Sequence, residues 1–366
     1  MTRTLSRPER IAWTRLARTP RIGPLTFHRL LARFRTSSAA LEALPRISDL
    51  NAPSADRAEA EIDAVEQLGA RLLASCEADY PPLLAQLDAP PPLIALRGDT
   101  ALLKRQTIAI VGSREGSASA LLFTERLAHD LGQAGYTVVS GMARGVDTAA
   151  HKGALETGTV AVLAGGLDHP YPPQNLKLHE AICARGAVVS EAPLGTIARA
   201  RDFPRRNAII SGVSRAVVVV EAALRSGSLI TARAAADQGR DVMAAPGSPL
   251  DHRARGSNAL IKQGATLIED AADVIAALGE SAPALRPLSA GPLFEHEAEP
   301  PPAGLPKKIA ALLSPTPVHV NELARLLDAP SGAVAAALTE LELTGAAASL
   351  PGGYAASSGA AFRDKS

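Results

Sequence analysis

The sequence contains little of what marks several common protein classes. Only two of its 366 residues are cysteines, Cys76 and Cys183, and they lie far apart with no metal-binding or C-x-x-C spacing. A reduced, cytoplasmic setting is the simplest interpretation. No apolar run reaches the length of a membrane span. Arginines also interrupt the first residues too often for the apolar core of a secretory leader. We therefore expect no membrane association.

Aromatic residues and net charge are also low. Phe, Trp and Tyr make up 3% of the chain, which weakens any model in which many bases stack on aromatic side chains. The formal net charge is +1, so the molecule as a whole is not a polycation. Residues 1–48 nevertheless hold ten arginines and two glutamates, a net charge of +8. Such a cluster can neutralise phosphates, although a solvated domain surface would have the same composition.

Several enzyme and cofactor motifs are absent. There is no G-x-x-x-x-G-K-[ST], which excludes a P-loop. A full G-x-G-x-x-G is missing, and the second predicted strand ends in Ser140-Gly141 instead of an acidic residue. The string GVSRA at 212–216 lacks the closing glycine of a nucleophile elbow. We therefore expect no organic cofactor and no catalytic triad.

A regular alternation of strands and helices is present from residue 107 to about residue 279. The predicted strands are short, continuously apolar runs at 107–113, 136–142, 159–166, 187–191, 215–222 and 241–247. Apolar runs of this kind, separated by helices, indicate a parallel sheet that is buried on both faces. The predicted fold class is α/β, with an extended Rossmann-like, doubly wound and mostly parallel sheet in a domain that covers residues 76–279.

Smaller units flank this domain. Residues 1–75 predict a small helical domain of the sterile-alpha-motif or helix-hairpin-helix type, with 55–75 as a connecting helix. Residues 280–303 are rich in proline and are interpreted as a linker. The pattern of 304–355 predicts a winged-helix-like domain, and 356–366 a disordered tail.

Candidate ligand-binding residues follow the first two predicted strands. Ligands of open parallel sheets bind beyond the carboxyl ends of the strands. Glycine lets a backbone approach a phosphate closely, a helix start can bind an anion, and arginine offers a bidentate cation. The alternative is a glycine turn with a surface arginine. The residues in question are Gly112, Ser113, Arg114, Gly141, Arg144 and Gly145.

Asp147 and His151 form a second type of candidate. They are four residues apart and therefore share one face of a helix. A metal pair is one interpretation, but no third ligand is evident. We favour a buried polar network or a helix cap, and predict no metal site.

Further polar residues follow the later strands. Lys177 comes two residues after Asn175, which is expected to start a helix. The segment 201–232 contains Arg205, Arg206 and Asn207, and a solvated basic face is the alternative interpretation. In the same segment Ser226-Gly227-Ser228 opens a predicted helix, and such a helix start can bind an anion.

Taken in order, these segments resemble the DNA-processing protein A family. The matching pieces are VGSR, SGMARGVDTAAH, GGLD with YP and N, SE-x-P-x-G, FP-x-RN-x-IISG, VVVEA, SGSLITA and PG, within about 105–265. The resemblance implies a non-catalytic protein that binds and protects incoming single-stranded DNA, forms a homodimer and helps to load the RecA recombinase in natural transformation. It assigns DNA contacts to Gly112, Ser113, Arg114, Gly141, Arg144, Gly145, Lys177, Arg205, Arg206 and Asn207.

The chain departs from this family pattern at two points, and two rival classes remain. Ala208 stands where a second arginine usually follows RN, and 198–201 reads ARAR without the usual proline. One rival is a nucleotide phosphoribohydrolase of the lysine-decarboxylase-like group, whose P-G-G-x-G-T-x-x-E motif is absent although Glu221 follows a strand. The other is a winged-helix regulator, which the even balance of five basic and five acidic residues in 304–366 disfavours.

Overall fold

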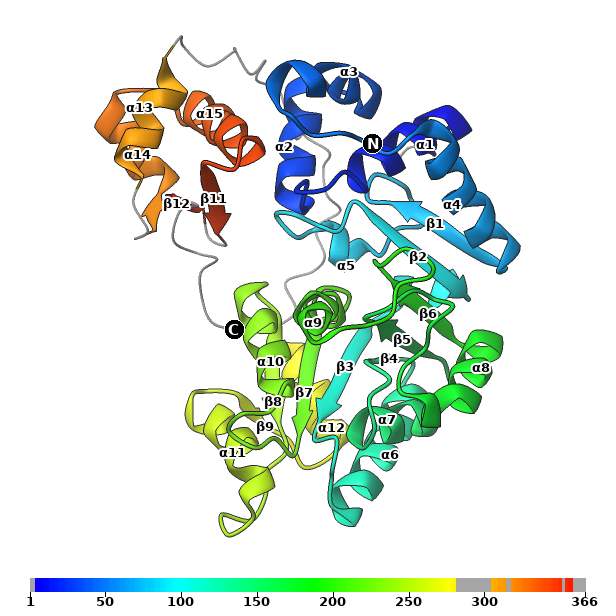
Figure 1. The fold of residues 1–366 in the computed structure, drawn as a ribbon. Helices are drawn as coiled ribbons and strands as arrows, with labels where there is room; N and C mark the ends of the chain where they lie inside the picture. The colour runs from blue at the N-terminus through cyan, green and yellow to red at the C-terminus, as the bar shows by residue number, and fades with distance from the viewer. Residues whose placement is uncertain (1–3, 281–303, 314–316, 351–352, 358–366) are drawn as a thin grey trace. The chain divides into compact units, whose positions relative to one another are not determined.

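The computed structural model describes residues 4–280, 304–313, 317–350 and 353–357. These residues fall into two compact units (Figure 1). One unit consists largely of residues 60–280, and the other of residues 5–59 together with the C-terminal segment from Gly304 onward. The predicted linker at 280–303 and the predicted tail at 356–366 lie almost wholly outside the described residues.

A nine-stranded sheet forms the centre of the larger unit, in the order β1-β2-β6-β5-β4-β3-β7-β8-β9. The strands β3 to β9 run parallel, whereas β2 pairs antiparallel with both β1 and β6. The predicted α/β class with a mostly parallel sheet is therefore confirmed. The strands are β1 (Ala70–Ala74), β2 (Leu93–Gly98), β3 (Thr107–Gly112), β4 (Thr137–Ser140), β5 (Thr159–Leu163), β6 (Ala187–Ser190), β7 (Ala216–Val220), β8 (Asp241–Ala244) and β9 (Thr266–Leu267).

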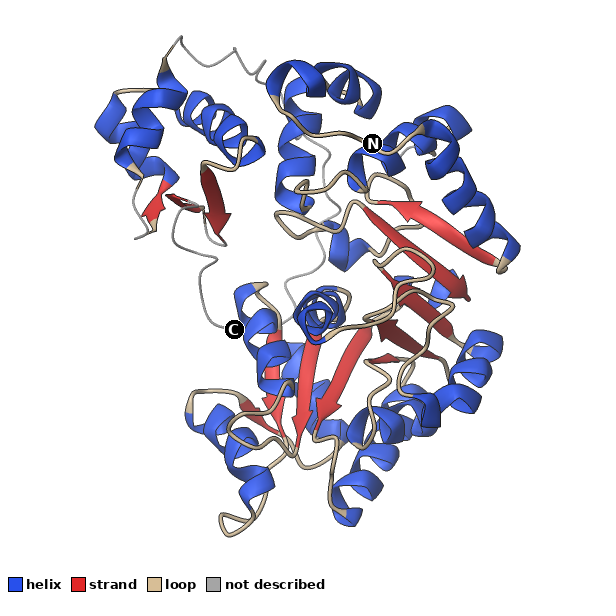
Figure 2. Ribbon diagram, viewed as in Figure 1, coloured by secondary structure: helices blue, strands red, loops and turns tan. Residues whose placement is uncertain are grey.

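The sheet is buried between two layers of helices (Figure 2). Successive side chains of a strand point to opposite faces. Ile108 and Ile110 of β3 accordingly join one apolar core, while Ala109 and Val111 join the other. The first core is covered by α6 (Ala118–Gln133), α7 (Val146–Gly153) and α12 (Ala271–Glu280), and the second by α5 (Pro82–Ala85), α9 (Phe203–Gly212), α10 (Ser228–Asp237) and α11 (Arg255–Lys262). The helix α8 (Leu176–Arg185) lies along β6 and its neighbours.

The segment before this domain differs from the expectation. Residues 55–75 were predicted as one connecting helix, but α4 (Ala55–Gln67) ends at a turn that contains Gly69, and β1 follows. Gly69 has a φ of +70°, a conformation that favours glycine and ends the helix. The short apolar run of β1 then pairs with β2 through five residue pairs and extends the sheet.

The second unit contains two small modules. Its N-terminal part consists of α1 (Arg7–Ala17), α2 (Pro24–Phe34) and α3 (Ser37–Ile47), with Trp13 packed against Phe27 at 5.0 Å between ring centroids. Its C-terminal part contains α13 (Leu305–Leu312), α14 (Val320–Leu327) and α15 (Ser331–Leu343), and a sheet of β10 (Val318–His319), β12 (Tyr354–Ser357) and β11 (Ala347–Leu350). This is the predicted winged-helix arrangement. Among all described residues, no helix is both long and apolar enough to cross a membrane.

Candidate nucleic-acid interface

Two of the predicted glycines let the loops beyond the strand ends pack closely together. A Cβ atom on Gly112 would lie 1.9 Å from the carbonyl oxygen of Val220 in β7. Gly145 has a φ of +78°, and a Cβ atom there would lie 2.3 Å from the carbonyl oxygen of Ser113. The Val146 N–H donates to that same oxygen at 3.1 Å. Because Gly112 and Gly145 have no side chains, the ends of β3, β4 and β7 can pack closely against one another.

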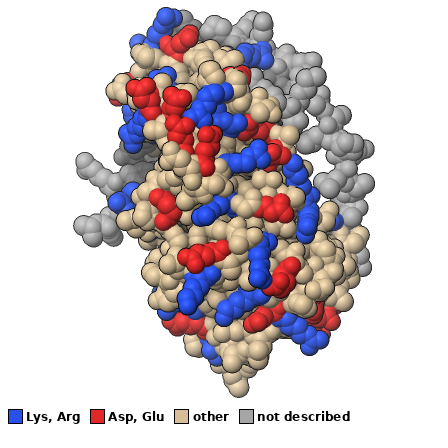
Figure 3. Space-filling model, turned by 90° about the vertical axis from the view of Figure 1, so that its right-hand side faces the viewer, with Lys and Arg blue, Asp and Glu red and all other residues tan. Residues whose placement is uncertain are grey.

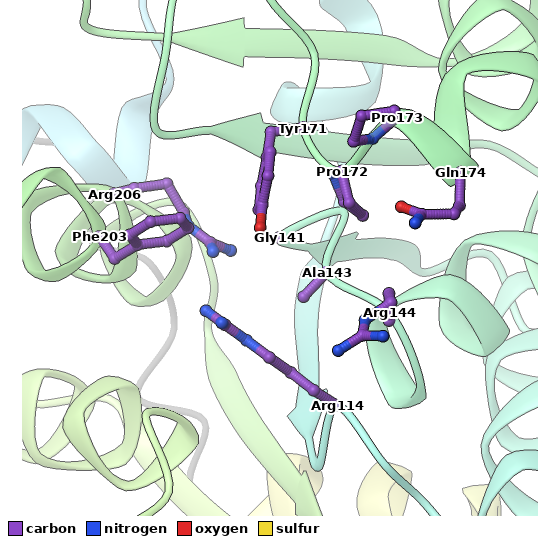
Figure 4. A pocket seen from close by; sticks show the side chains of 10 residues that line it. All are labelled: Arg114, Gly141, Ala143, Arg144, Tyr171, Pro172, Pro173, Gln174, Phe203 and Arg206. Carbon is purple, nitrogen blue, oxygen red and sulfur yellow. The ribbon is translucent and has the colours of Figure 1, made fainter. Parts of the chain in front are cut away.

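A cavity of about 290 Å³ lies beside these loops. In Figure 4 the side chains of Arg114, Arg144 and Arg206 face the same space from three different elements. Arg114 follows β3, Arg144 lies between β4 and α7, and Arg206 belongs to α9. Three cations around one space make it suited to an anionic ligand. We call this space the smaller cavity, because a larger one adjoins it. The residues that line it are Arg114, Gly141, Ala143, Arg144, Tyr171, Pro172, Pro173, Gln174, Phe203 and Arg206.

Arg206 is the buried member of this group, with 6% of its surface exposed. Its Nη1 lies 3.8 Å from Oδ2 of Asp147, which is buried as well. Burial raises the pKa of Asp147, and the positive charge of Arg206 opposes that rise. Among the described residues, Nε of Arg206 has no hydrogen-bond partner. The guanidinium is therefore held by a carboxylate and retains an unused donor.

Gly141 makes the position of Arg206 possible. A Cβ atom on Gly141 would lie 1.3 Å from Nη1 of Arg206, so no larger residue fits without displacing the guanidinium. The sequence singled out both residues, but for a phosphate role. The structure shows that the glycine creates room for a side chain of the protein itself.

Two aromatic rings, Tyr171 and Phe203, also line this cavity. Tyr171 and Phe203 meet edge to face at 6.3 Å between ring centroids, and Tyr171 is 55% exposed. The guanidinium carbons of Arg114 and Arg206 lie 5.3 and 5.4 Å from the centroid of Phe203. Cations at this distance from a ring attract it and hold it in place. Although aromatics are rare in the chain, two of them line this one cavity.

Neighbouring polar residues fix the loop after β4. The Asn175 Nδ2 atom donates to the carbonyl oxygens of Met142 and Ala143 at 2.8 and 3.3 Å, whereas its side chain forms no cap on α8. Asp147 accepts from the N–H of Ala143 at 3.2 Å. The Nδ1 atom of His151 lies 2.8 Å from the Thr159 hydroxyl, and burial lowers the pKa of His151 to about 3. Asp147 therefore fixes the loop that lines the cavity, whereas His151 bonds to Thr159 of β5.

A second, larger cavity of about 530 Å³ lies between β3, α9 and the start of α10. It shares Arg114, Ala143, Phe203 and Arg206 with the smaller cavity. Three more of the residues predicted to contact DNA line the larger cavity: Gly112, Ser113 and Asn207. The Asn207 Nδ2 atom donates to the carbonyl oxygen of Gly227 at 3.3 Å and so connects α9 to the turn before α10.

Three of the predicted contact residues line neither cavity. Gly145 supports the loops, as described above, and Lys177 is exposed in the first turn of α8. Arg205 is exposed, and its Nη2 bonds Oε1 of Glu191 at 2.5 Å. Ala208, which departs from the family pattern, is half-buried in α9 and also lines neither cavity. Contacts of these residues with DNA stay predictions.

Glu221 has a structural partner. Its two carboxylate oxygens accept from the N–H and the hydroxyl of Ser117 at 2.8 and 2.5 Å. Ser117 in turn caps α6, because its hydroxyl accepts from the N–H of Ala120. Glu221 therefore anchors the start of a helix.

The face of the molecule shown in Figure 3 carries charges of both signs. On this face, basic and acidic side chains are interspersed over the surface instead of forming a patch of one sign.

Fold and cavities together define a class of protein: a Rossmann-like α/β protein with an arginine-lined and aromatic-lined cleft beyond the strand ends. Residues 71–279 match the family model of DNA recombination-mediator protein A, and this is more than half of the chain. Residues 7–64 match the DprA-like N-terminal HHH domain, and 295–353 the DprA winged helix domain. The chain therefore belongs to the DNA recombination-mediator protein A family.

Individual relatives agree with this assignment. Protein Smf of Escherichia coli is 38% identical over 305 residues, which cover 81% of this chain and 80% of that protein. DNA processing protein DprA of Streptococcus pneumoniae is 42% identical over 54% of this chain and 70% of its own length. The solved structure of the pneumococcal protein superimposes with a TM-score of 0.63 and 30% identity, over 75% of this chain and 98% of that chain. DNA processing protein A of Helicobacter pylori, solved in a study of its single-stranded DNA binding mode, gives a TM-score of 0.53 and 29% identity over 58% and 96% of the two chains.

Proposed function

We propose that this protein binds single-stranded DNA in the smaller cavity and acts without a catalytic step in DNA processing and recombination. One observation carries the proposal. Arg114, Arg144 and Arg206 surround a space that Phe203 and Tyr171 also line. Arginines neutralise phosphates, and aromatic rings stack on bases of any sequence. The combination suits a nucleotide within a strand.

The position of the rings favours single strands over duplexes. A base can stack on Tyr171 or Phe203 only if it has left its own stack. In a single strand this costs little, whereas in a duplex it requires unpairing as well. The Helicobacter pylori relative was studied for its single-stranded DNA binding, and its likeness supports the same ligand class here.

The proposed partners are a second copy of the chain and RecA. A cavity of this size holds only a few nucleotides, so two cavities joined in a homodimer would present a longer strand for RecA loading. Of the apolar residues that α10 and α11 could contribute to a dimer face, Leu229, Leu260 and Ile261 pack against the core, whereas Ile230 is 45% exposed. Exposed apolar side chains that are available for such a face are therefore Ile230, Leu250 and Leu267.

The proposal places the protein in the cytoplasm, where it would protect incoming DNA during natural transformation. No observation favours the phosphoribohydrolase alternative. Both carboxylate oxygens of Glu221 are engaged by Ser117, so this carboxylate is occupied as a helix anchor. That supports a binding function.

The experiment is a salt titration of oligothymidylate binding with the full chain and its Arg114→Ala variant. Arg126, which is 85% exposed on α6 and lines neither cavity, supplies the matched control Arg126→Ala. We expect Arg114→Ala to lose about tenfold in affinity and to lower the slope of log K against log salt by about 0.7. Equal affinity and slope in the Arg114→Ala and Arg126→Ala variants would contradict the proposal.

A further inference from the structure

The winged-helix domain contains a helix that is poorly suited to DNA. In a DNA-binding helix-turn-helix motif the second helix enters the major groove. In this domain the two helices of such a motif correspond to α14 and α15. The sequence of α15, SGAVAAALTELEL, contains no lysine or arginine, and its charged residues are Glu340 and Glu342. Phosphates would repel these two carboxylates, so a positively charged partner suits α15 better than DNA does.

Such a partner lies within the same compact unit, on α2. Nη1 of Arg29 lies 3.2 Å from Oε2 of Glu342, and it also donates to the hydroxyl of Ser349 at 3.0 Å. Nη1 of Arg33 lies 2.9 Å from Oε1 of Glu340. None of the four charged side chains is more than 27% exposed. The winged-helix domain therefore covers the two arginines of α2, and we call these ion pairs the α2–α15 contact.

The two arginines of α2 would suit a phosphate backbone if they were uncovered. They are four residues apart and therefore share one face of the helix. Guanidinium groups bind phosphates by two parallel hydrogen bonds. Other arginines of the N-terminal helices have partners nearby in the sequence: Arg15 donates to the carbonyl oxygen of Pro53, and Arg21 pairs with Asp49. The charge partners of the arginines of α2 come instead from the winged-helix domain.

The α2–α15 contact carries a cost that is not fully offset. Oε1 of Glu342 is buried and has no hydrogen-bond partner among the described residues. Burial raises the pKa of Glu342, and the positive charge of Arg29 opposes that rise. A buried ion pair stabilises little when its remaining polar atoms lack partners. The winged-helix domain also has an apolar core of its own within residues 305–355, so opening the contact need not unfold the domain.

We propose that the winged-helix domain regulates a second nucleic-acid-binding surface, by covering Arg29 and Arg33 with its two glutamates. The ligand of the uncovered surface is the phosphate backbone of a nucleic acid, duplex or single-stranded, because arginines bind phosphates whatever the sequence. The glutamates and the phosphates compete for the same guanidinium groups. Binding at this surface therefore requires release of the winged-helix domain. The inference does not depend on the smaller cavity, which belongs to the other unit.

Two matched double variants of the full chain separate this contact from a general effect of charge. Glu340→Gln/Glu342→Gln removes two negative charges from the α2–α15 contact and keeps the shape of the side chains. Glu322→Gln/Asp328→Asn removes two negative charges from exposed positions of the same domain and is the control. Asp328 has a φ of +48°, a conformation that asparagine adopts readily, so the control should keep the fold.

The first measurement is the rate at which phenylglyoxal, an arginine-specific reagent, modifies Arg29 and Arg33, with the products identified by mass spectrometry. Both arginines should react severalfold faster in Glu340→Gln/Glu342→Gln than in the control, because the contact has opened. A short blunt-ended DNA duplex should then protect them. Equal rates in the two double variants would overturn the inference, since the ion pairs would not be what covers the arginines.

The second measurement is the affinity for the same duplex as a function of salt. A surface that is open in about one molecule in ten loses about tenfold in apparent affinity, so Glu340→Gln/Glu342→Gln should bind about tenfold more tightly than the control. Its slope of log K against log salt should be steeper by about 1.8, as expected for two further phosphate contacts. Adding Arg29→Ala and Arg33→Ala should abolish this gain. Uncovered arginines without a gain in affinity would overturn the inference, as would a gain that survives the loss of both arginines.

Discussion

The two cavities share a wall and differ in almost everything else that lines them. The smaller cavity adds an exposed arginine, Arg144, and the ring of Tyr171, whereas the larger adds the serines and backbone of a helix start. Rings and arginines are suited to bases and phosphates together, whereas the first N–H groups of α10 already bond to Ser226 and Gly227. The two adjoining cavities therefore differ in the groups that they offer to a ligand.

Two arginines, Arg114 and Arg206, line both cavities, and they differ in burial. Arg206 is fixed by burial and by Asp147, so little freedom remains to be lost when a ligand binds. Arg114 is exposed and contacts the face of Phe203. We therefore propose that Arg206 shapes the wall that the two cavities share, and that Arg114 contacts phosphate directly.

The largest expected effect comes from removing the shared buried cation. The Arg206→Met variant leaves the Asp147 carboxylate buried without its charge partner. Loss of one partner of a buried pair costs about 3–5 kcal/mol. Chemical denaturation should show this loss in the free energy of unfolding, and the affinity for single-stranded DNA should fall as well. A variant as stable as the parent would contradict the assigned role of Arg206.

The pH dependence of this variant sharpens the assignment. Burial raises the pKa of Asp147 in the folded state, and without the charge of Arg206 that rise is larger, because only hydrogen bonds from Ala143, Ser140 and Gly141 still oppose it. A carboxyl whose folded-state pKa lies above its unfolded value stabilises the fold at low pH, and that contribution is lost as pH rises through the folded pKa. The stability deficit of Arg206→Met should therefore shrink as pH falls. In the double variant Arg206→Met/Asp147→Asn, which has no such carboxyl, the deficit should not vary in this way.

A smaller effect is expected from displacing the shared cation without removing it. In Gly141→Ala the new methyl group overlaps Nη1 of Arg206 and must push the guanidinium aside. Overpacking of this kind costs about 1–3 kcal/mol. The matched control is Gly227→Ala, where a Cβ atom has open space. If thermal unfolding and short-strand affinity change equally in both variants, the close approach of Gly141 to Arg206 has no energetic weight.

The sequence predicted the central sheet because its strands are buried on both faces. A strand that is buried on both faces needs apolar residues at successive positions. The run TIAIVGS has them, and β3 occupies Thr107–Gly112 within it. The strands β1, β2 and β9 were not predicted. The strands β1 and β9 lie at the edges of the sheet, and such short runs carry too little pattern to distinguish them from a helix end or a loop. The strand β2 pairs antiparallel with β1 and β6, so it lies outside the strand–helix alternation on which the prediction was based.

The binding site was predicted less completely than the fold. Arg114, Arg144 and Arg206 were identified because arginines beside strand ends stand out in the sequence. Phe203 was missed, since one ring in a basic segment has no periodic signal, although its place directly before Pro204 and the two arginines was a usable clue. The roles of Gly141 and Asp147 depend on contacts across the site, which no local pattern encodes.

The central claim is that single-stranded DNA lies in the smaller cavity, and photo-crosslinking tests it most directly. Oligothymidylates that carry 5-iododeoxyuridine would be bound to the full chain, irradiated, and the modified residues identified by mass spectrometry. The account predicts crosslinks at Tyr171 and Phe203, the rings on which a base would stack. It also predicts that Arg114→Ala reduces their yield while Arg126→Ala does not. Crosslinks confined to the arginine-rich helices α1, α2 and α3, with none at either ring, would contradict it.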